Sequence, residues 1–339
     1  MSPSARPSPL RLLHLLAVVL LAGLPLGAHA EGKAVRILTI GNSFSRDALG
    51  FLPEVAASRG NKVIMATANM PGAPMSLHTK AIDAYEKDPM DPKGKIYGES
   101  SVQLFSTDPD APQPPPYTKT EKASLKDLLT YQKWDYVTIQ QVSKESFKPE
   151  SYEPFAKQLV DYIHKYAPQA EILIHQTWAY REDHGFFNKG DGFTQLKMYE
   201  GLKSAYNQLS EHYKLRLVPV GDAFQTARGT EMWTFVKDAD FDYKNPAEGA
   251  LPKERNSLNS GWNWGTNAET GLKQLRYDGI HANTAGRYLG AATFYEFLFG
   301  DSAENLTFVP KGLTPEQAAS LRAIAHQVLT AKPALTATP

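Results

Sequence analysis

Ser43 is the first residue in the sequence whose type and position could do chemistry. It lies in the segment Gly-Asn-Ser-Phe-Ser at residues 41–45, between the apolar run of residues 35–40 and an amphipathic stretch. A serine between a predicted strand and a predicted helix can be held on a tight turn, where unpaired helix N–H groups suit a developing oxyanion. The alternative is that Ser43 or Ser45 caps the helix, as serine often does.

A carboxylate and an imidazole occur together near the other end of the chain, in the segment Asp278-Gly279-Ile280-His281. On a turn, this spacing lets the carboxylate bind one imidazole nitrogen while the other nitrogen faces a serine. A hydroxyl, an imidazole and a carboxylate are the parts of a nucleophilic acyl-transfer site. The alternative is an Asp that caps the next helix beside an incidental surface His.

The elements that must position these residues alternate between strand-like and helix-like segments. This alternation predicts a parallel sheet covered by helices on both faces. We therefore expect one α/β domain over residues 31–339, with a three-layer, doubly wound parallel sheet. The predicted strands are residues 35–40, 62–68, 136–139, 171–175 and 216–220, and the predicted helices are residues 48–59, 152–166, 195–213, 285–299 and 315–330.

Three segments interrupt the alternation and are predicted to be long loops. Residues 79–126 include a proline cluster at 112–116, and are interpreted as loop or a small hairpin. Residues 178–193 are rich in Gly and charge, and residues 231–276 carry aromatic side chains among Asn, Gly and Pro. Ligands bind at the carboxyl ends of strands in open α/β sheets. We expect these insertions to form the walls of the site.

The N-terminal 30 residues are interpreted as a cleavable signal peptide. Arg6 and Arg11 precede an apolar run at residues 12–26, and Ala28-His29-Ala30 provides a small-x-small cleavage site. A membrane anchor is the alternative, but the run is short for a bilayer span and Pro25 interrupts it. We expect cleavage after Ala30 and a secreted or periplasmic protein with no stable membrane insertion.

Composition excludes several classes of function. After loss of Arg6 and Arg11 the mature chain would carry 34 basic residues (36 minus 2) against 36 acidic ones. The excess of positive charge that is typical of nucleic-acid-binding proteins is therefore missing. The sequence has no cysteine, which excludes a thiol nucleophile and a thiolate metal site. His175, Asp183 and His184 lack the spacing of a zinc site, so we expect no metal and no other cofactor.

The ordered set of motifs resembles the SGNH (GDSL-type) hydrolases. More narrowly, the chain is similar to a poorly characterised branch of secreted bacterial proteins that start with Ile-Gly-Asn-Ser-Phe-Ser, here residues 40–45. Trp-Asp-Tyr at 134–136, His-Gln-Thr-Trp-Ala-Tyr at 175–180 and Asp-Gly-Ile-His at 278–281 support the resemblance. It spans roughly residues 35–299 and implies the flavodoxin-like fold of that superfamily.

The resemblance implies roles for particular residues. Ser43 would be the nucleophile with its own N–H in the oxyanion hole, His281 the general base and Asp278 its partner. Gly72 would give a second oxyanion N–H, although Pro-Gly is also a common turn. The third donor is normally an asparagine in a Gly-x-Asn context, where this chain has Gln140 and Gln141. A glutamine amide offers the same donor on a longer stem.

Further side chains could contact a substrate. They lie beside the catalytic motifs, past predicted strand ends, or in the aromatic insertions, where indole rings could stack on sugars. The alternatives are structural: a lone His is more often buried and bonded, and aromatic clusters more often close a loop core. These candidates are Asn42, His78, Trp178, Tyr180, Arg181, Trp262 and Trp264.

We therefore predict a secreted serine esterase that acts on a small-molecule or glycan ester, with an acylated carbohydrate favoured by analogy within the family. One alternative is a non-catalytic glycan-binding protein on a degenerate scaffold, because the usual asparagine is absent and the insertions are aromatic. Another is acyl transfer to a sugar hydroxyl, which uses the same triad and differs in how water is excluded. The sequence leaves the oligomeric state open.

Overall fold

The central sheet of the protein has six strands in the order β3-β2-β1-β4-β5-β6. All neighbouring strands are parallel except the edge strand β3, which is antiparallel to β2. Among the parallel strands this is the flavodoxin-like order, with the topological switch point between β1 and β4. The strands are β1 (Ala34–Gly41), β2 (Lys62–Asn69), β3 (Leu104–Ser106), β4 (Tyr136–Ile139), β5 (Glu171–His175) and β6 (Arg216–Val218).

The structure is a computed structural model that describes Met1 and residues 32–99, 101–102, 104–107 and 120–331. The predicted signal peptide at residues 1–30 and the proline cluster at 112–116 lie outside these residues, Met1 apart. None of the described helices is both long and apolar enough to cross a membrane.

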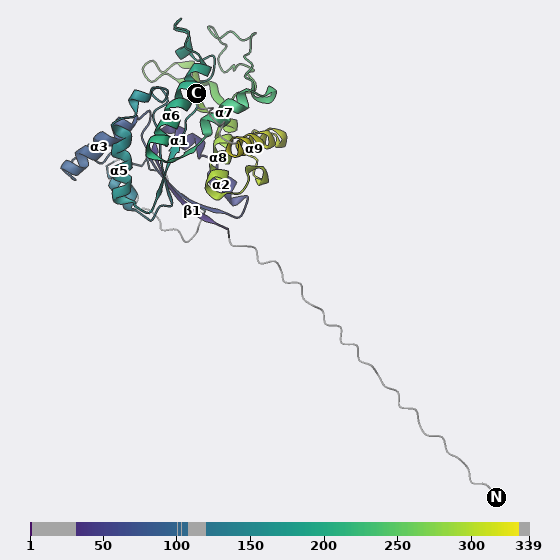
Figure 1. Cartoon of the computed structure of the whole chain (residues 1–339). Helices are drawn as coiled ribbons and strands as arrows, with labels where there is room; N and C mark the ends of the chain where they lie inside the picture. Colours follow the sequence, from purple (N-terminus) through teal and green to yellow (C-terminus); the bar gives the residue numbers. More distant parts are fainter. Residues whose placement is uncertain (2–31, 100, 103, 108–119, 332–339) are drawn as a thin grey trace, which may run out of the picture. The chain divides into compact units, whose positions relative to one another are not determined.

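Helices cover both faces of the sheet and make the predicted three layers. In Figure 1, α3 and α5 lie on one side of the sheet, and α2, α8 and α9 lie on the other. The inner strands are buried along almost their whole length, as expected for a parallel sheet covered on both faces. The helices are α1 (Ser43–Ala48), α2 (Leu52–Ala57), α3 (Met75–Lys87), α4 (Leu125–Thr130), α5 (Phe155–Tyr166), α6 (Gln195–Tyr213), α7 (Val220–Arg228), α8 (Thr284–Phe299) and α9 (Pro315–Thr330).

The helix predicted at residues 48–59 is wrong in two respects. The chain forms two short helices there, and the first begins at Ser43, directly after β1. Pro53 separates them because it has no N–H to donate to residue 49, and proline is favoured in the first turn of a new helix. Similarly, the strand predicted at 216–220 ends at Val218, and the unpredicted helix α7 follows Pro219.

The long insertions contain more regular structure than expected. The segment 79–126 begins inside α3 and ends inside α4, and β3 lies between them. The segment 231–276 includes most of an antiparallel hairpin, β7 (Asn259–Thr266) and β8 (Lys273–Ala282). By contrast, the segment 178–193 has a single 3-10 turn at Gly185–Phe187. Asp278 and His281 therefore lie at the end of β8, held by pairing with β7.

Candidate active site

Ser43, His281 and Asp278 form a continuous chain of hydrogen bonds. Ser43 Oγ lies 2.8 Å from His281 Nε2, and His281 Nδ1 lies 2.9 Å from Asp278 Oδ2. The other carboxylate oxygen of Asp278 accepts the backbone N–H groups of Ile280 and His281. With the carboxylate fixed in this way, Nδ1–H donates to Asp278 and Nε2 is left to accept the Ser43 proton.

Ser43 is positioned by close packing between the end of β1 and Gln140, the residue that follows β4. Asn42 caps α1, with its side-chain oxygen accepting the Phe44 N–H at 3.1 Å. A Cβ atom added at Gly41 would lie 2.7 Å from the Gln140 side chain, so only glycine fits at the end of β1. Ser43 therefore sits on the turn between β1 and α1, beside the topological switch point of the sheet.

Three side chains or backbone groups from other elements hold the strand end that carries His281. The Trp178 indole donates to the Ile280 carbonyl at 3.0 Å, and the Arg181 N–H donates to the Gly279 carbonyl at 2.8 Å. Asp47, one turn after Ser43 on α1, accepts the Ala282 N–H at 3.1 Å. Asp47 thus links the serine helix directly to the histidine strand.

Asp47 is a functional candidate that the sequence reasoning missed. Its side chain is 1% exposed and forms an ion pair with Arg287, at 2.8 Å. Burial raises the pKa of Asp47, while the charges of Arg287 and His281 act against that rise. No local sequence pattern pairs residue 47 with residue 282, so only the fold shows the contact.

Charges around the triad favour an ionised carboxylate and a basic imidazole. The hydrogen bond that His281 donates to Asp278 raises the pKa of His281, although burial opposes the rise. Burial alone would raise the pKa of Asp278, but the hydrogen bonds from the ring and backbone of His281 lower it to about 2. Asp278 is consequently a carboxylate at neutral pH, and it stabilises the proton that His281 takes from serine.

Ser43 and His281 open into a cavity of about 390 Å³, within the range of small-molecule sites. Gly72, Ser143 and Tyr180 line it together with Ser43 and His281. Gly72 has a φ of +62°, a conformation that favours glycine. Within the described part of the chain, the backbone N–H groups of Gly72 and Ser143 have no protein acceptor. They are available to a ligand atom in the cavity.

The structure brings neither Gln140 nor Gln141 to this cavity, contrary to the expectation that one replaces the missing asparagine. Gln140 donates to Asn42 Oδ1 at 2.7 Å and accepts the Ser45 hydroxyl at 2.6 Å. Gln141 donates to the Ser151 carbonyl at 2.8 Å, and its oxygen accepts backbone N–H groups. The longer stem of glutamine lets both amides reach partners inside the protein, and neither side chain lines the cavity.

Asn42 and His78 both support the serine turn, and Asn42 also lines the cavity. The Asn42 amide donates to the Ala73 carbonyl at 3.1 Å, next to Gly72, while its oxygen caps α1. His78 is buried between the Tyr97 hydroxyl and the Gly41 carbonyl, and burial lowers its pKa to about 4. Neutral His78 can donate to Gly41, which fixes the end of β1 immediately before the serine turn.

Of the three candidates after β5, one lines the cavity. The Tyr180 hydroxyl lies 2.9 Å from Ser143 Oγ, and both residues face the triad. Trp178 is fully buried and stacks on Phe44 with ring centroids 4.2 Å apart. Arg181 is 2% exposed and holds Asp183 and Glu254 in ion pairs of 2.7 Å each. Trp178 and Arg181 therefore shape the site without reaching it.

The tryptophans of the β7–β8 hairpin do not line the triad cavity. The Trp264 indole donates to the Ala250 carbonyl at 2.7 Å and closes its own loop. Trp262 packs against Tyr243 and Tyr277, with ring centroids 5.2 and 4.9 Å apart. It lines a different cavity of about 380 Å³, which also includes Arg181.

Nothing in the described residues forms a group of three or more His, Asp and Glu side chains that could hold a metal ion. His175 is fully buried, Asp183 is bound to Arg181, and His184 caps a 3-10 turn. These three residues, considered together in the sequence, have separate structural roles.

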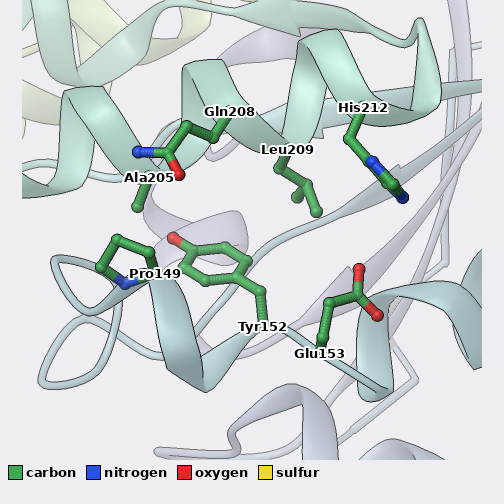
Figure 2. A pocket seen from close by; sticks show the side chains of 7 residues that line it. All are labelled: Pro149, Tyr152, Glu153, Ala205, Gln208, Leu209 and His212. Carbon is green, nitrogen blue, oxygen red and sulfur yellow. The ribbon is translucent and has the colours of Figure 1, made fainter.

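A further pocket, shown in Figure 2, contains no member of the triad. It lies between α6, which contributes Ala205, Leu209 and His212, and the segment that carries Tyr152 and Glu153. The Tyr152 hydroxyl donates to the Ser146 carbonyl, and Glu153 accepts the Tyr213 hydroxyl. Of these two bonds, the one between Glu153 and Tyr213 joins the segment to α6.

Comparison with known proteins supports the fold. The sequence matches the family model of a domain of unknown function, DUF4886, over residues 113–244, a segment that contains none of the three triad residues. A solved DUF4886 family protein from Bacteroides uniformis has a TM-score of 0.63 at 24% identity, covering 88% of this chain and 96% of that chain. At this level of identity the likeness shows a shared fold.

Other solved structures are more distant. A protein from Slackia heliotrinireducens, provisionally described as an SGNH hydrolase, has a TM-score of 0.43 at 18% identity, over 78% of this chain and 98% of that chain. Phospholipase A1 from Streptomyces albidoflavus has a TM-score of 0.35 at 11% identity, over 75% of this chain and 95% of that chain. No curated protein matches the sequence.

Proposed function

We propose that this protein is a serine esterase of the SGNH type, with Ser43 as nucleophile, His281 as general base and Asp278 as its partner. The observation that carries the proposal is the unbroken hydrogen-bonded chain from Ser43 Oγ through His281 to Asp278, facing an open cavity. A scaffold that only binds a ligand has no need for an ionised carboxylate behind an imidazole that faces a serine. The fold and its switch point agree with this assignment.

The chemistry follows from the geometry. His281 Nε2 takes the hydroxyl proton as Ser43 Oγ attacks the ester carbonyl, and Asp278 stabilises the imidazolium. The N–H groups of Ser43 and Gly72 donate to the oxyanion, and the unpartnered N–H of Ser143 offers a third donor in place of the glutamines. The protonated His281 then gives its proton to the leaving alcohol, and water releases the acyl group by the same route.

Hydrolysis is favoured over transfer to a second alcohol by the exposure of the triad. The His281 side chain is 37% exposed and that of Asp278 is 31% exposed. Acyl transferases depend on excluding water from the acyl-enzyme. At this exposure, water has direct access to the base.

The test is activity on 4-nitrophenyl acetate by the purified chain and its Ser43→Ala variant. We expect the variant to lose at least about 10⁴-fold in kcat, because the nucleophile is removed while the fold is kept. Ser204→Ala is the matched control, since Ser204 is an exposed residue of α6 and is bonded to Gln208 of the same helix. A Ser43→Ala rate equal to wild type, or no labelling of Ser43 by a fluorophosphonate, would sink the proposal.

We also propose that the protein is exported and acts on an ester of a small molecule or an acylated carbohydrate, with no nucleic-acid partner. The support for export is the pattern of Arg6, Arg11, the apolar run and Ala28-His29-Ala30. Expression in a bacterial host, followed by N-terminal sequencing, tests it. A mature chain starting at Glu31 is expected, and retention of the first 30 residues would contradict it.

A further inference from the structure

The cavity at Ser43 and His281 has a one-sided charge. Its lining includes Arg46, from α1, and Lys144, from the segment after β4. No Asp or Glu lines it. Cavities lined by one sign of charge with low-dielectric walls concentrate ligands of the opposite sign.

Neither cation is used by the protein itself. Within the described residues, the Arg46 guanidinium and the Lys144 ammonium take part in no hydrogen bond or ion pair. The guanidinium groups of the other described arginines, Arg255 apart, all have a hydrogen-bond or ion-pair partner in the protein. Arg46 and Lys144 are exposed and face the same open space, so an anion in the cavity could meet both.

The position of Arg46 also places it within electrostatic reach of the general base. Its charge acts to lower the pKa of His281, against the larger effect of Asp278. By itself, the charge of Arg46 therefore opposes formation of the imidazolium. A bound negative group would screen that effect and restore the basicity that Asp278 provides.

From these observations we infer that the ester substrate is an anion, whose negative group is bound by Arg46 and Lys144 beside the reacting carbonyl. The inference rests on the proposed esterase function and adds its substrate class. A carboxylate on either the acyl part or the alcohol part of the ester would satisfy both cations. The rest of the chemistry is unchanged, because the negative group takes no part in bond making.

The test compares each charged ester with a neutral analogue, in which the free carboxylate is converted to a methyl ester. 3-Acetoxy-4-nitrobenzoate carries its charge on the alcohol part, and mono-4-nitrophenyl adipate carries it on the acyl part. In at least one of these pairs we expect the wild type to favour the charged ester by about tenfold in kcat/KM at low ionic strength, and less in high salt. The ratio within a pair cancels any general loss of activity.

The variant Arg46→Gln/Lys144→Gln should bring this ratio close to one. Arg36→Gln/Lys157→Gln is the control: it removes the same net charge from ion-paired cations of β1 and α5, away from the cavity, and should keep the ratio. A wild-type ratio of one or less in both pairs, or an unchanged ratio in the Arg46/Lys144 variant, would overturn the inference.

Binding to the Ser43→Ala variant separates this inference from the proposed function. Calorimetry should show that the variant binds a charged ester about tenfold more tightly than its methyl ester, whether or not the wild type hydrolyses it. Equal affinities would contradict the anion site even in an active esterase. Conversely, anion preference without Ser43-dependent hydrolysis would contradict the esterase alone.

Discussion

A single chain of hydrogen bonds links three residues in this site, and its direction depends on one carboxylate. Asp278 uses one oxygen for the imidazole and the other for the two backbone N–H groups of its own turn. The carboxylate therefore sets both the conformation of the turn and the tautomer of His281. Its low pKa and the raised pKa of His281 are consequences of the same contact.

Removing the charge of Asp278 should change the rate and the pH profile together. Only neutral His281 can accept the serine proton, so kcat/KM should rise with pH through a pKa above 6.5 in the wild type. In Asp278→Asn, the amide would favour the wrong tautomer and lower kcat by roughly 10⁴-fold. Without the carboxylate the pKa of His281 should be lower, so the rising limb of the residual kcat/KM should move to lower pH.

The measurement is kcat/KM for a neutral ester between pH 5 and pH 9, at constant ionic strength. Asp161→Asn is a suitable control, because Asp161 is an exposed partner of Lys157 on α5. A rising limb that stays at the wild-type pH in Asp278→Asn would show that Asp278 does not control the base.

At the scale of elements, the site is held where β1 and β4 end and where β8 meets α1. Gln140 joins the ends of β4 and β1 through Asn42 and Ser45. Asn42 extends the network to the Gly72 turn through the Ala73 carbonyl. Asp47 joins α1 to β8 in the same way. Gln140 and Asn42 act on the catalytic groups through backbone position, whereas Asp47 also acts on His281 through its charge.

Gln140 should behave as a positioning residue. Gln140→Leu leaves Asn42 Oδ1 and Ser45 Oγ without their partner, so we expect the free energy of unfolding to fall by about 1–3 kcal/mol, with a lower kcat. The measurements are urea unfolding and kcat on the same preparations, with Gln208→Leu on the exposed side of α6 as control. A loss of kcat with unchanged stability would instead indicate a direct contact with the oxyanion.

Asp47→Asn should keep an acceptor for the Ala282 N–H but remove the negative charge beside His281. Since the charge of Asp47 raises the pKa of His281, we expect the rising limb of kcat/KM to move to lower pH. Asp222→Asn on α7 is the control, as it is not among the groups that act on His281. An unchanged limb in Asp47→Asn would leave Asp47 with a structural role only.

At the scale of the whole molecule, burial of neutral histidines makes stability depend on pH. His175, at the end of β5, is fully buried between aromatic rings, and neither ring nitrogen has a hydrogen-bond partner in the described structure. Burial lowers its pKa to about 3. The unfolded chain can protonate this side chain near its ordinary pKa of 6.5, whereas the folded chain resists protonation down to about pH 3.

The stability that neutral His175 gives to the folded state is therefore fully present above about pH 6.5. The free energy of unfolding decreases as the pH falls from 6.5 towards 3. Between pH 8 and pH 5 this single group should cost the wild type about 2 kcal/mol of unfolding free energy. His175→Leu should reduce the difference between the two pH values by that amount in urea unfolding. His212→Leu, on α6, serves as the control. An identical pH dependence in His175→Leu and wild type would refute this assignment.

The sequence alone predicted the five parallel strands and five helical segments, and it singled out the three residues that the fold brings into one chain of hydrogen bonds. Apolar runs and helix periodicity are local, so most predicted elements lie within a few residues of the observed ones. Ser43, Asp278 and His281 were predictable as a set because the ordered motifs resemble a known family, whereas each motif alone also fits a helix cap or a surface residue. The helices α3, α4 and α7 and the split of the helix after Ser43 were missed; Pro53 and Pro219 mark the breaks before α2 and α7, which periodicity alone does not show.

Only the tertiary structure decided where the remaining side chains point. The sequence does not distinguish Gln140 from Gln141 as oxyanion donors, and in the structure both bind groups inside the protein. Asp47 could not be found from the sequence, because its partner Ala282 is 235 residues away. A hydrogen bond between distant segments depends on the register and approach of packed elements, and no local pattern of residue types contains that information.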